Sequence, residues 1–90
     1  MNKNIANYTV IIEKQKRLGT GKDCFAAYVP VLGLAIDADS IEAVEKEVKS
    51  LIEFHIQSLA EEGETIPVES EETLVTRSKV VIPFGARLAA

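Results

Sequence analysis

The sequence predicts an α+β fold in which one long helix packs on one face of an antiparallel sheet of three to four strands. Three observations predict it: β-favouring runs with glycine-containing turns in residues 5–38, an amphipathic helical segment after them, and a β-favouring run at 79–83. The expected order is β-β-β-α-β. A chain of 90 residues has room for one domain, residues 1–90, and its core is expected at about 5–83.

The first three strands are predicted from residue type and from the breaks between them. Ile5–Lys14 is rich in β-branched and aromatic residues, which favour a strand. The basic run 15–23 contains two glycines and is expected to turn the chain back. Cys24–Pro30 is then the returning strand, and Gly33–Ala38 is a short third strand.

A long amphipathic helix follows the third strand. Asp39 and Ser40 are both favourable N-cap residues, and Asp39 with Glu42 has the spacing of a capping box. Gly63 is expected to end the helix. Residues at three- and four-residue intervals form one apolar stripe, which needs a sheet to cover it: Ile41, Val44, Val48, Leu51, Ile52, His55 and Leu59.

The last third of the chain is predicted to hold a loop and a fourth strand. Residues 65–78 are polar and acidic and contain a proline, which is typical of a loop. Lys79–Pro83 has the composition of a strand, and Phe84–Ala90 of the start of a short helix.

Charge is distributed unevenly along the sequence. Residues 37–72 hold twelve acids and two lysines, a net charge of −10, whereas residues 1–23 and 73–90 each carry +3. An acidic segment of this strength repels nucleic acid and attracts basic proteins. Direct DNA binding by this chain is therefore not expected. The alternative is that these acids form only a solvated helix face and loop.

Compartment and assembly are predicted from composition. The single Cys24 cannot form an intramolecular disulfide, and no segment reads as a signal peptide or membrane span, so a cytoplasmic location without membrane association is expected. Because one helix covers only one face of a sheet, the other face is either solvated or paired, and we expect a homo-oligomer, most simply a dimer.

Two single residues have both a chemical and a packing interpretation. His55 is a possible base or ligand, but it lies in the apolar stripe and the chain has no second histidine, which favours a packing role. Cys24 lies in a strand beside an aromatic residue, which favours a small packing side chain over a reactive thiol.

Two short motifs also have a catalytic interpretation. Asp37 and Asp39 are two residues apart in one segment, whereas a magnesium site needs carboxylates that converge from separate elements. Gly19-x-Gly21-Lys22 lacks the first half of a phosphate-binding loop and is not followed by a helix signal. No catalytic residue, metal ligand or cofactor is therefore predicted, and a metal-dependent nuclease stays the weakest alternative.

The order of these segments resembles the amino-terminal domain of the HicB-like antitoxins, which has a reduced ribonuclease H-like fold. The stretches that carry the likeness are TVIIE, FAAYVPVLGL and DADSIEAVEKEVKSLIEFHIQSLAEEGETIP. The positions that match the family pattern are Pro30, Leu32, Gly33, Asp39, Ser40, His55, Glu61, Glu62, Gly63 and Pro67. The chain departs from the pattern in lacking the second proline of the strand connection, and Ile36-Asp37-Ala38 replaces a small or glycine-containing lead into the helix. Longer relatives append a DNA-binding domain, which the seven residues after Pro83 are too few to form.

The resemblance implies a non-enzymatic antitoxin-type protein whose partner is a small basic ribonuclease of the HicA type. Such a protein neutralises the toxin by covering its RNA-binding and catalytic surface. The alternative is a solitary homo-oligomeric module of unknown ligand without a toxin. The partner-binding residues are expected around the strand-to-helix corner: Tyr28, Val31, Leu32, Asp37, Glu42 and Glu45.

Overall fold

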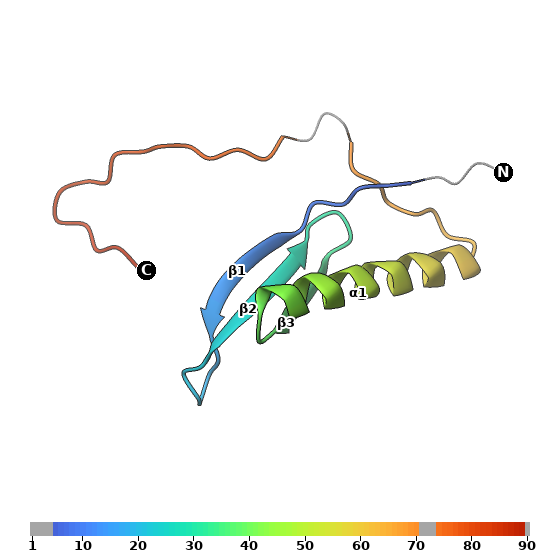
Figure 1. The fold of residues 1–90 in the computed structure, drawn as a ribbon. Coiled ribbons are helices and arrows are strands. Elements are labelled where there is room, and N and C mark those ends of the chain that lie inside the picture. The colour runs from blue at the N-terminus through green and yellow to red at the C-terminus, as the bar shows by residue number, and fades with distance from the viewer. Residues whose placement is uncertain (1–4, 71–73, 90) are drawn as a thin grey trace.

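Three antiparallel strands and one helix form the body of the protein, in a computed structural model that describes residues 5–70 and 74–89. The strands β1 (Ile11–Lys16), β2 (Asp23–Val29) and β3 (Leu34–Ala38) pair in the order β1-β2-β3, so β1 and β3 are the two edges. The helix α1 (Ile41–Glu61) lies across one face of this sheet (Figure 1). The predicted α+β class, with one long helix on one face of an antiparallel sheet, is confirmed.

Two glycine-containing turns set the register of the sheet. Between β1 and β2 the backbone N–H of Arg17 donates to the carbonyl of Lys22 at 2.8 Å, and Gly19 and Gly21 both adopt positive φ. That conformation is accessible to glycine without strain. Between β2 and β3 the turn closes on Gly33, whose φ is +66°. Tyr28 of β2 consequently lies between Ile11 and Ala35 of the neighbouring strands.

The start of α1 differs in detail from the prediction. Ser40 is the N-cap residue, and its hydroxyl accepts a hydrogen bond from the backbone N–H of Ala43 at 3.1 Å. Asp39 instead binds Arg17, so the capping box expected between Asp39 and Glu42 is not the cap that forms. The helix ends as predicted before Gly63, which has a φ of +70°.

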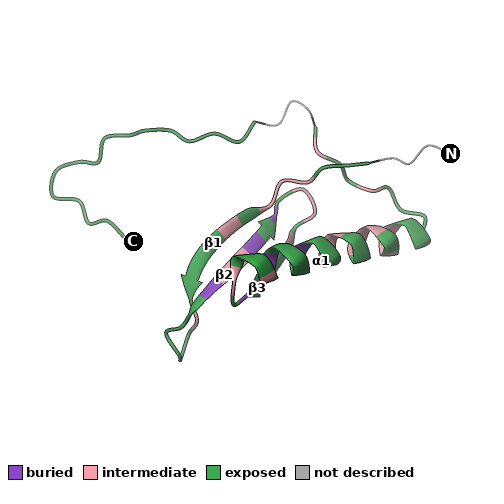
Figure 2. Cartoon of the chain, viewed as in Figure 1, coloured by how far each residue is buried: buried purple, intermediate pink, exposed green. Residues whose placement is uncertain are grey.

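The core lies between α1 and the sheet face that it covers. It consists of Ala27, Val29, Ala38, Val44 and Val48, all buried. Val44 is fully buried and Val48 is 3% exposed, whereas the other residues of the predicted stripe are half-buried or exposed. The reason is length: α1 has 21 residues and spans about 31 Å, while strands of five to seven residues span only about 17–23 Å. The carboxyl-terminal half of α1 therefore extends beyond the sheet (Figures 1 and 2).

After α1 the chain returns to the amino-terminal side of β1. Tyr8 donates its hydroxyl proton to the carbonyl of Pro67 at 2.6 Å, and the carboxylate of Glu69 accepts from both the backbone N–H and the hydroxyl of Thr9. These bonds fix the segment 66–69 beside residues 8–9. The first strand itself begins at Ile11 rather than at Ile5, so the prediction placed its start too early.

The predicted fourth strand at Lys79–Pro83 was wrong: within the described residues it is not part of the sheet. Residues 74–89, here called the C-terminal arm, run away from the body and are exposed throughout (Figures 1 and 2). The radius of gyration is 17.2 Å, against about 12 Å expected for a compact chain of this length. Strand propensity alone does not form a strand, because the backbone also needs a neighbouring edge to bond. The predicted helix start at Phe84–Ala90 is a turn at Phe84–Gly85, and Ala90 lies outside the described residues.

Candidate partner-binding surface

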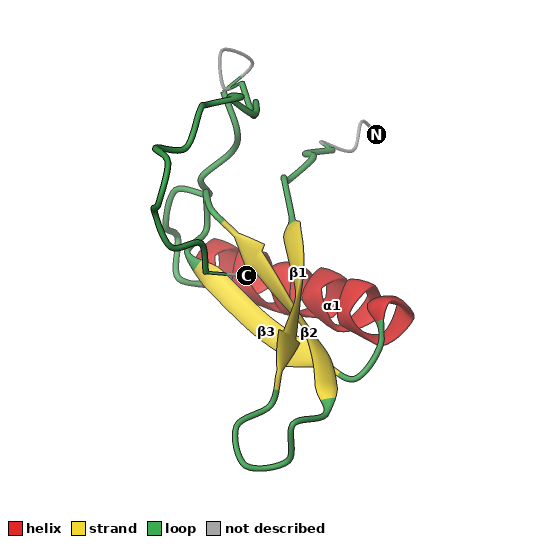
Figure 3. Ribbon diagram, turned by 90° about the vertical axis from the view of Figure 1, so that its left-hand side faces the viewer, coloured by secondary structure: helices red, strands yellow, loops and turns green. Residues whose placement is uncertain are grey.

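The sheet face opposite α1, here called the open face, is not covered by any element of the described chain (Figure 3). Side chains that alternate with the core residues point to this face, and the register places Ile11, Tyr28 and Ala35 in one row across it. Tyr28 is 47% exposed and Ile11 39%. The row is an apolar surface with a phenolic hydroxyl at its centre, a combination suited to protein contacts.

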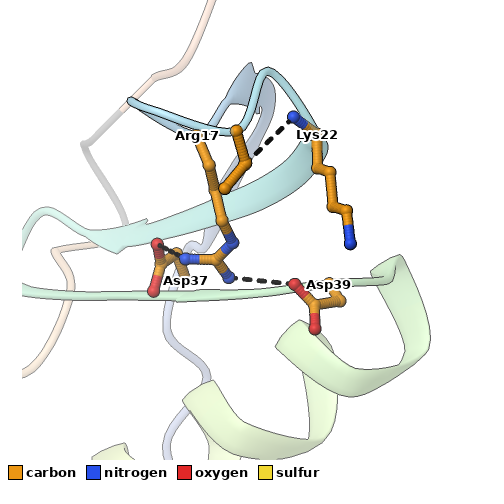
Figure 4. A network of polar contacts seen from close by, with 5 residues as sticks. Arg17, Lys22, Asp37 and Asp39 are labelled. Atoms are coloured by element: carbon orange, nitrogen blue, oxygen red, sulfur yellow. Dashed lines mark hydrogen bonds and ion pairs between the residues drawn. The ribbon is translucent and has the colours of Figure 1, made fainter.

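One end of the open face carries a cluster of three charged residues. Arg17, immediately after β1, holds Asp37 through Nη1 at 3.2 Å and Asp39 through Nη2 at 3.0 Å (Figure 4). The hydrogen bond to Asp39, followed by the charge of Asp37, raises the pKa of the Arg17 guanidinium above its ordinary value. The two carboxylates weighed as magnesium ligands are thus engaged with a cation.

The described residues contain no group of three or more His, Cys, Asp or Glu side chains that could hold a metal ion. His55 lies half-buried on the part of α1 that extends beyond the sheet, and Cys24 is buried in β2. His55 and Cys24 therefore lie on different elements, α1 and β2, and neither belongs to a group of potential metal ligands within the described residues.

A second candidate surface lies on α1. All five of its glutamates are exposed, together with its two lysines, Lys46 and Lys49. Three of the glutamates share one side of the helix, and we call them the acidic helix surface: Glu42, Glu45 and Glu53. None of them takes part in the ion pairs found in residues 5–70 and 74–89, which join Lys14 and Lys16 to Asp23 and Arg17 to Asp37 and Asp39. The basic residues of the β1–β2 hairpin thus neutralise acids of the sheet, while the carboxylates of α1 face solvent.

The residues predicted to bind a partner are divided among three places. Tyr28 and Asp37 share the open face, from neighbouring strands. Val31 and Leu32 lie in the β2–β3 turn, at the opposite end of β3 from the start of α1, and Leu32 packs against the core. Five strand residues separate this turn from the helix, which is about 17 Å.

The two predicted glutamates lie in the other layer of the molecule. Glu42 belongs to the first turn of α1 and Glu45 to the next, where it lines a groove between α1 and the chain entering β1. The strand-to-helix corner therefore does not gather all six residues on one surface. Sequence reasoning grouped them by proximity in the chain, whereas the alternation of strand side chains separates the two faces.

Sequence reasoning missed Arg17 and Phe54. Arg17 is 20 residues from Asp37, and the pairing depends on a register that the sequence does not specify.

Phe54 is 71% exposed and lines a groove beside β3, here called the β3 groove. Its position outside the predicted apolar stripe was visible in the sequence, but a single exposed apolar residue is common on protein surfaces, and only the groove shows that Phe54 lies beside other apolar side chains. The β3 groove has a volume of about 600 Å³ and is lined by Ile36, Ala43, Lys46, Glu47, Ser50, Leu51 and Phe54.

Comparisons with protein-family models, with curated proteins and with solved structures find no match for this chain. Within the described residues, no helix has the length and apolar character needed to cross a membrane.

Proposed function

We propose that this protein is a non-enzymatic, antitoxin-type binding protein that neutralises a small basic ribonuclease of the HicA type by covering its RNA-binding and catalytic surface. The family and the partner are inferred from the sequence resemblance to HicB-like antitoxins. A cytoplasmic location is part of this proposal.

The observation that carries the proposal is the acidic helix surface. Its three carboxylates lie on one side of α1 and are exposed, and no ion pair within the described residues neutralises them. A protein that binds RNA presents a basic surface to the phosphates. An acidic helix competes for that surface through opposite charge, and it also accelerates the encounter of the two proteins.

The open face supplies an apolar surface that complements this electrostatic one. Tyr28 and Ile11 are the kind of residues that provide contact area in protein interfaces, and Arg17 at one end of the open face provides a charged rim. Charge speeds the encounter, and apolar contacts determine how slowly the complex dissociates.

The alternative function is a solitary homo-oligomeric module that binds an unidentified ligand. The exposed apolar residues of the C-terminal arm favour this alternative, because they suit contacts between chains irrespective of a toxin. Self-association and toxin binding are compatible, so a dimer alone does not exclude the antitoxin.

The test is an RNA-cleavage assay with the purified chain and the small basic protein encoded beside its gene. We expect cleavage to stop once the chain is in molar excess. Undiminished cleavage at excess chain would remove the antitoxin proposal, and magnesium-dependent cleavage by the chain alone would replace it with a nuclease.

Paired charge reversals test the role of the acidic helix surface. In the Glu42→Lys/Glu45→Lys variant we expect the association rate to fall by about tenfold, with little change in the dissociation rate. The matched control is Glu61→Lys/Glu62→Lys, which changes the net charge equally at the end of α1. Equal slowing in the two variants would mean that net charge, rather than this surface, governs the encounter.

A further inference from the structure

Half of the exposed large apolar residues of the described chain lie in the C-terminal arm. Val81 is 95% exposed, and six further large apolar side chains of the arm are also open to solvent: Leu74, Val75, Val80, Ile82, Phe84 and Leu88. A run of this kind, with strand-forming residues and no covering element, is typical of a surface that contacts another chain.

We propose that residues 79–83 of the arm add as a fourth strand to the free edge of β3 in a second copy of this chain, and that the exchange is reciprocal. The product is a two-fold symmetric dimer in which each sheet has four strands. The occupant is a segment of this same protein, and this inference does not depend on the antitoxin proposal.

The two edges of the sheet differ in how well they can accept a strand. The β1 edge carries Lys14, Gln15 and Lys16, all exposed, and charged lysines at an edge oppose pairing. The β3 edge has the sequence Leu-Ala-Ile-Asp-Ala, and its one charge, Asp37, is already paired with Arg17. The less protected edge is therefore β3.

The β3 groove provides a place for the side chains of the incoming strand. Ile36, Leu51 and Phe54 form its apolar part, and Phe54 is unusually exposed for a helix aromatic. Alternate residues of a strand share a face, so Val80 and Ile82 would enter this groove while Lys79 and Val81 lie on the open face. The five residues of the arm segment also match the five of β3.

A second copy fits this site better than the chain's own arm does. The hydrogen bonds of Tyr8 and Thr9 fix the segment 66–69 on the β1 side, so the arm starts at the far edge of the sheet from its own β3. Charge favours contact between an arm and a body, since residues 1–72 carry −7 and residues 73–90 carry +3. Two-fold symmetry doubles every contact, which brings a short strand nearer to the roughly 1,200 Å² of a stable interface.

The first experiment measures the oligomeric state of the full chain by sedimentation velocity over a range of concentrations. We expect a dimer at micromolar concentration. The Val80→Asp/Ile82→Asp variant should weaken the dimer by about 100-fold or more, because buried apolar contacts are lost in both arms. Phe54→Asp should weaken it in the same direction. The matched control is Leu18→Asp at the fully exposed β1–β2 turn, which should dimerise like the parent.

The second experiment identifies the acceptor edge with single cysteines in a Cys24→Ala background. Chains carrying Val81→Cys are mixed with chains carrying either Ala35→Cys on β3 or Glu13→Cys on β1, and a short bis-maleimide is added. We expect a crosslinked pair with Ala35→Cys and little with Glu13→Cys. Both acceptor positions lie on the open face, so they differ only in the edge.

Three results would overturn the proposal: a monomer at high micromolar concentration, a dimer that persists in the Val80→Asp/Ile82→Asp variant, or preferential crosslinking to the β1 position. A crosslink formed only within a single chain that carries both cysteines would show instead that the arm folds back on its own sheet. Because the arm lies outside the core, circular dichroism should show an unchanged body in the arm variants.

Discussion

The body and the C-terminal arm have similarly apolar sequences and opposite structures. In β2, Ala27 and Val29 are buried because α1 covers them, whereas Val80 and Val81 of the arm are exposed although their residue types favour a strand equally. The difference lies in what surrounds them: β2 has a strand on each side and a helix above it. A β-favouring segment becomes a strand only where an edge and a covering layer are available.

The largest expected difference between the two regions is in the cost of removing a side chain. Val44→Ala should destabilise the chain by about 2–3 kcal/mol, because Val44 is fully buried and truncation leaves a cavity under α1. Val81→Ala, at a concentration where the chain is monomeric, should change the free energy of unfolding by less than about 0.5 kcal/mol. Denaturant unfolding of the two variants measures both. A loss for Val44→Ala no larger than for Val81→Ala would mean that the core has been placed wrongly.

The cap of α1 should have an intermediate effect. Ser40→Ala removes the hydroxyl that accepts from the Ala43 N–H, and we expect a loss of about 1 kcal/mol. Ser50→Ala, in the middle of the same helix and exposed, is the matched control and should be neutral or slightly stabilising. Thermal unfolding followed by circular dichroism compares them. If the two variants unfold alike, Ser40 is not the cap in solution.

Loss of a hydrogen bond at the junction between body and arm should loosen the chain only near that junction. Glu69→Ala removes the acceptor of both Thr9 hydrogen bonds, and we expect a loss of about 1 kcal/mol. Limited proteolysis should detect this as faster cleavage near residues 66–70. Glu64→Ala in the exposed connection is the control. Unchanged cleavage in the Glu69 variant would show that this contact does not hold the junction.

Acid should produce the smallest effect. Hydrogen bonds from Lys16 and then Lys14 lower the pKa of Asp23 in the folded chain. The contribution of Asp23 to the free energy of unfolding is therefore complete above its unfolded pKa of about 3.9. It is lost as the pH falls through the lower pKa of the folded chain. Because the pair is exposed, the contribution is small and is reduced by salt. Between pH 5 and pH 2 the free energy of unfolding, measured by denaturant unfolding, should fall slightly less in Asp23→Asn than in the parent chain. An equal fall in the two proteins would contradict this prediction.

Local signals predicted most of the body. The helix was predicted from its periodicity and from Gly63, and two of the three strands were predicted to within a residue at each end because turns bound them closely. The first strand was harder, since Ile5–Val10 has the same residue types as the strand but leads into it instead. Of the two predicted caps, Ser40 forms the cap, and the capping box predicted for Asp39 does not form, since Asp39 binds Arg17.

The candidate surface was less predictable than the fold. Asp37 and Glu42 are five residues apart, yet one lies on the open face and the other on the helix layer. The acidic character of the helix surface was visible in the sequence, but which carboxylates are neutralised depends on the sheet register. The unpaired arm was not predictable, because the pattern of Lys79–Pro83 is the same whether its partner edge belongs to one chain or to two.

Amide hydrogen exchange tests most directly the claim that the arm lacks a partner in one chain and finds it in a second. The amides of Val80, Val81 and Ile82 should exchange freely in dilute solution and gain protection as the chain concentration rises. Protection of Ala27 and Val29 in β2 should stay high throughout. Protection of residues 80–82 that is independent of concentration, or absent even at high micromolar concentration, would contradict the account.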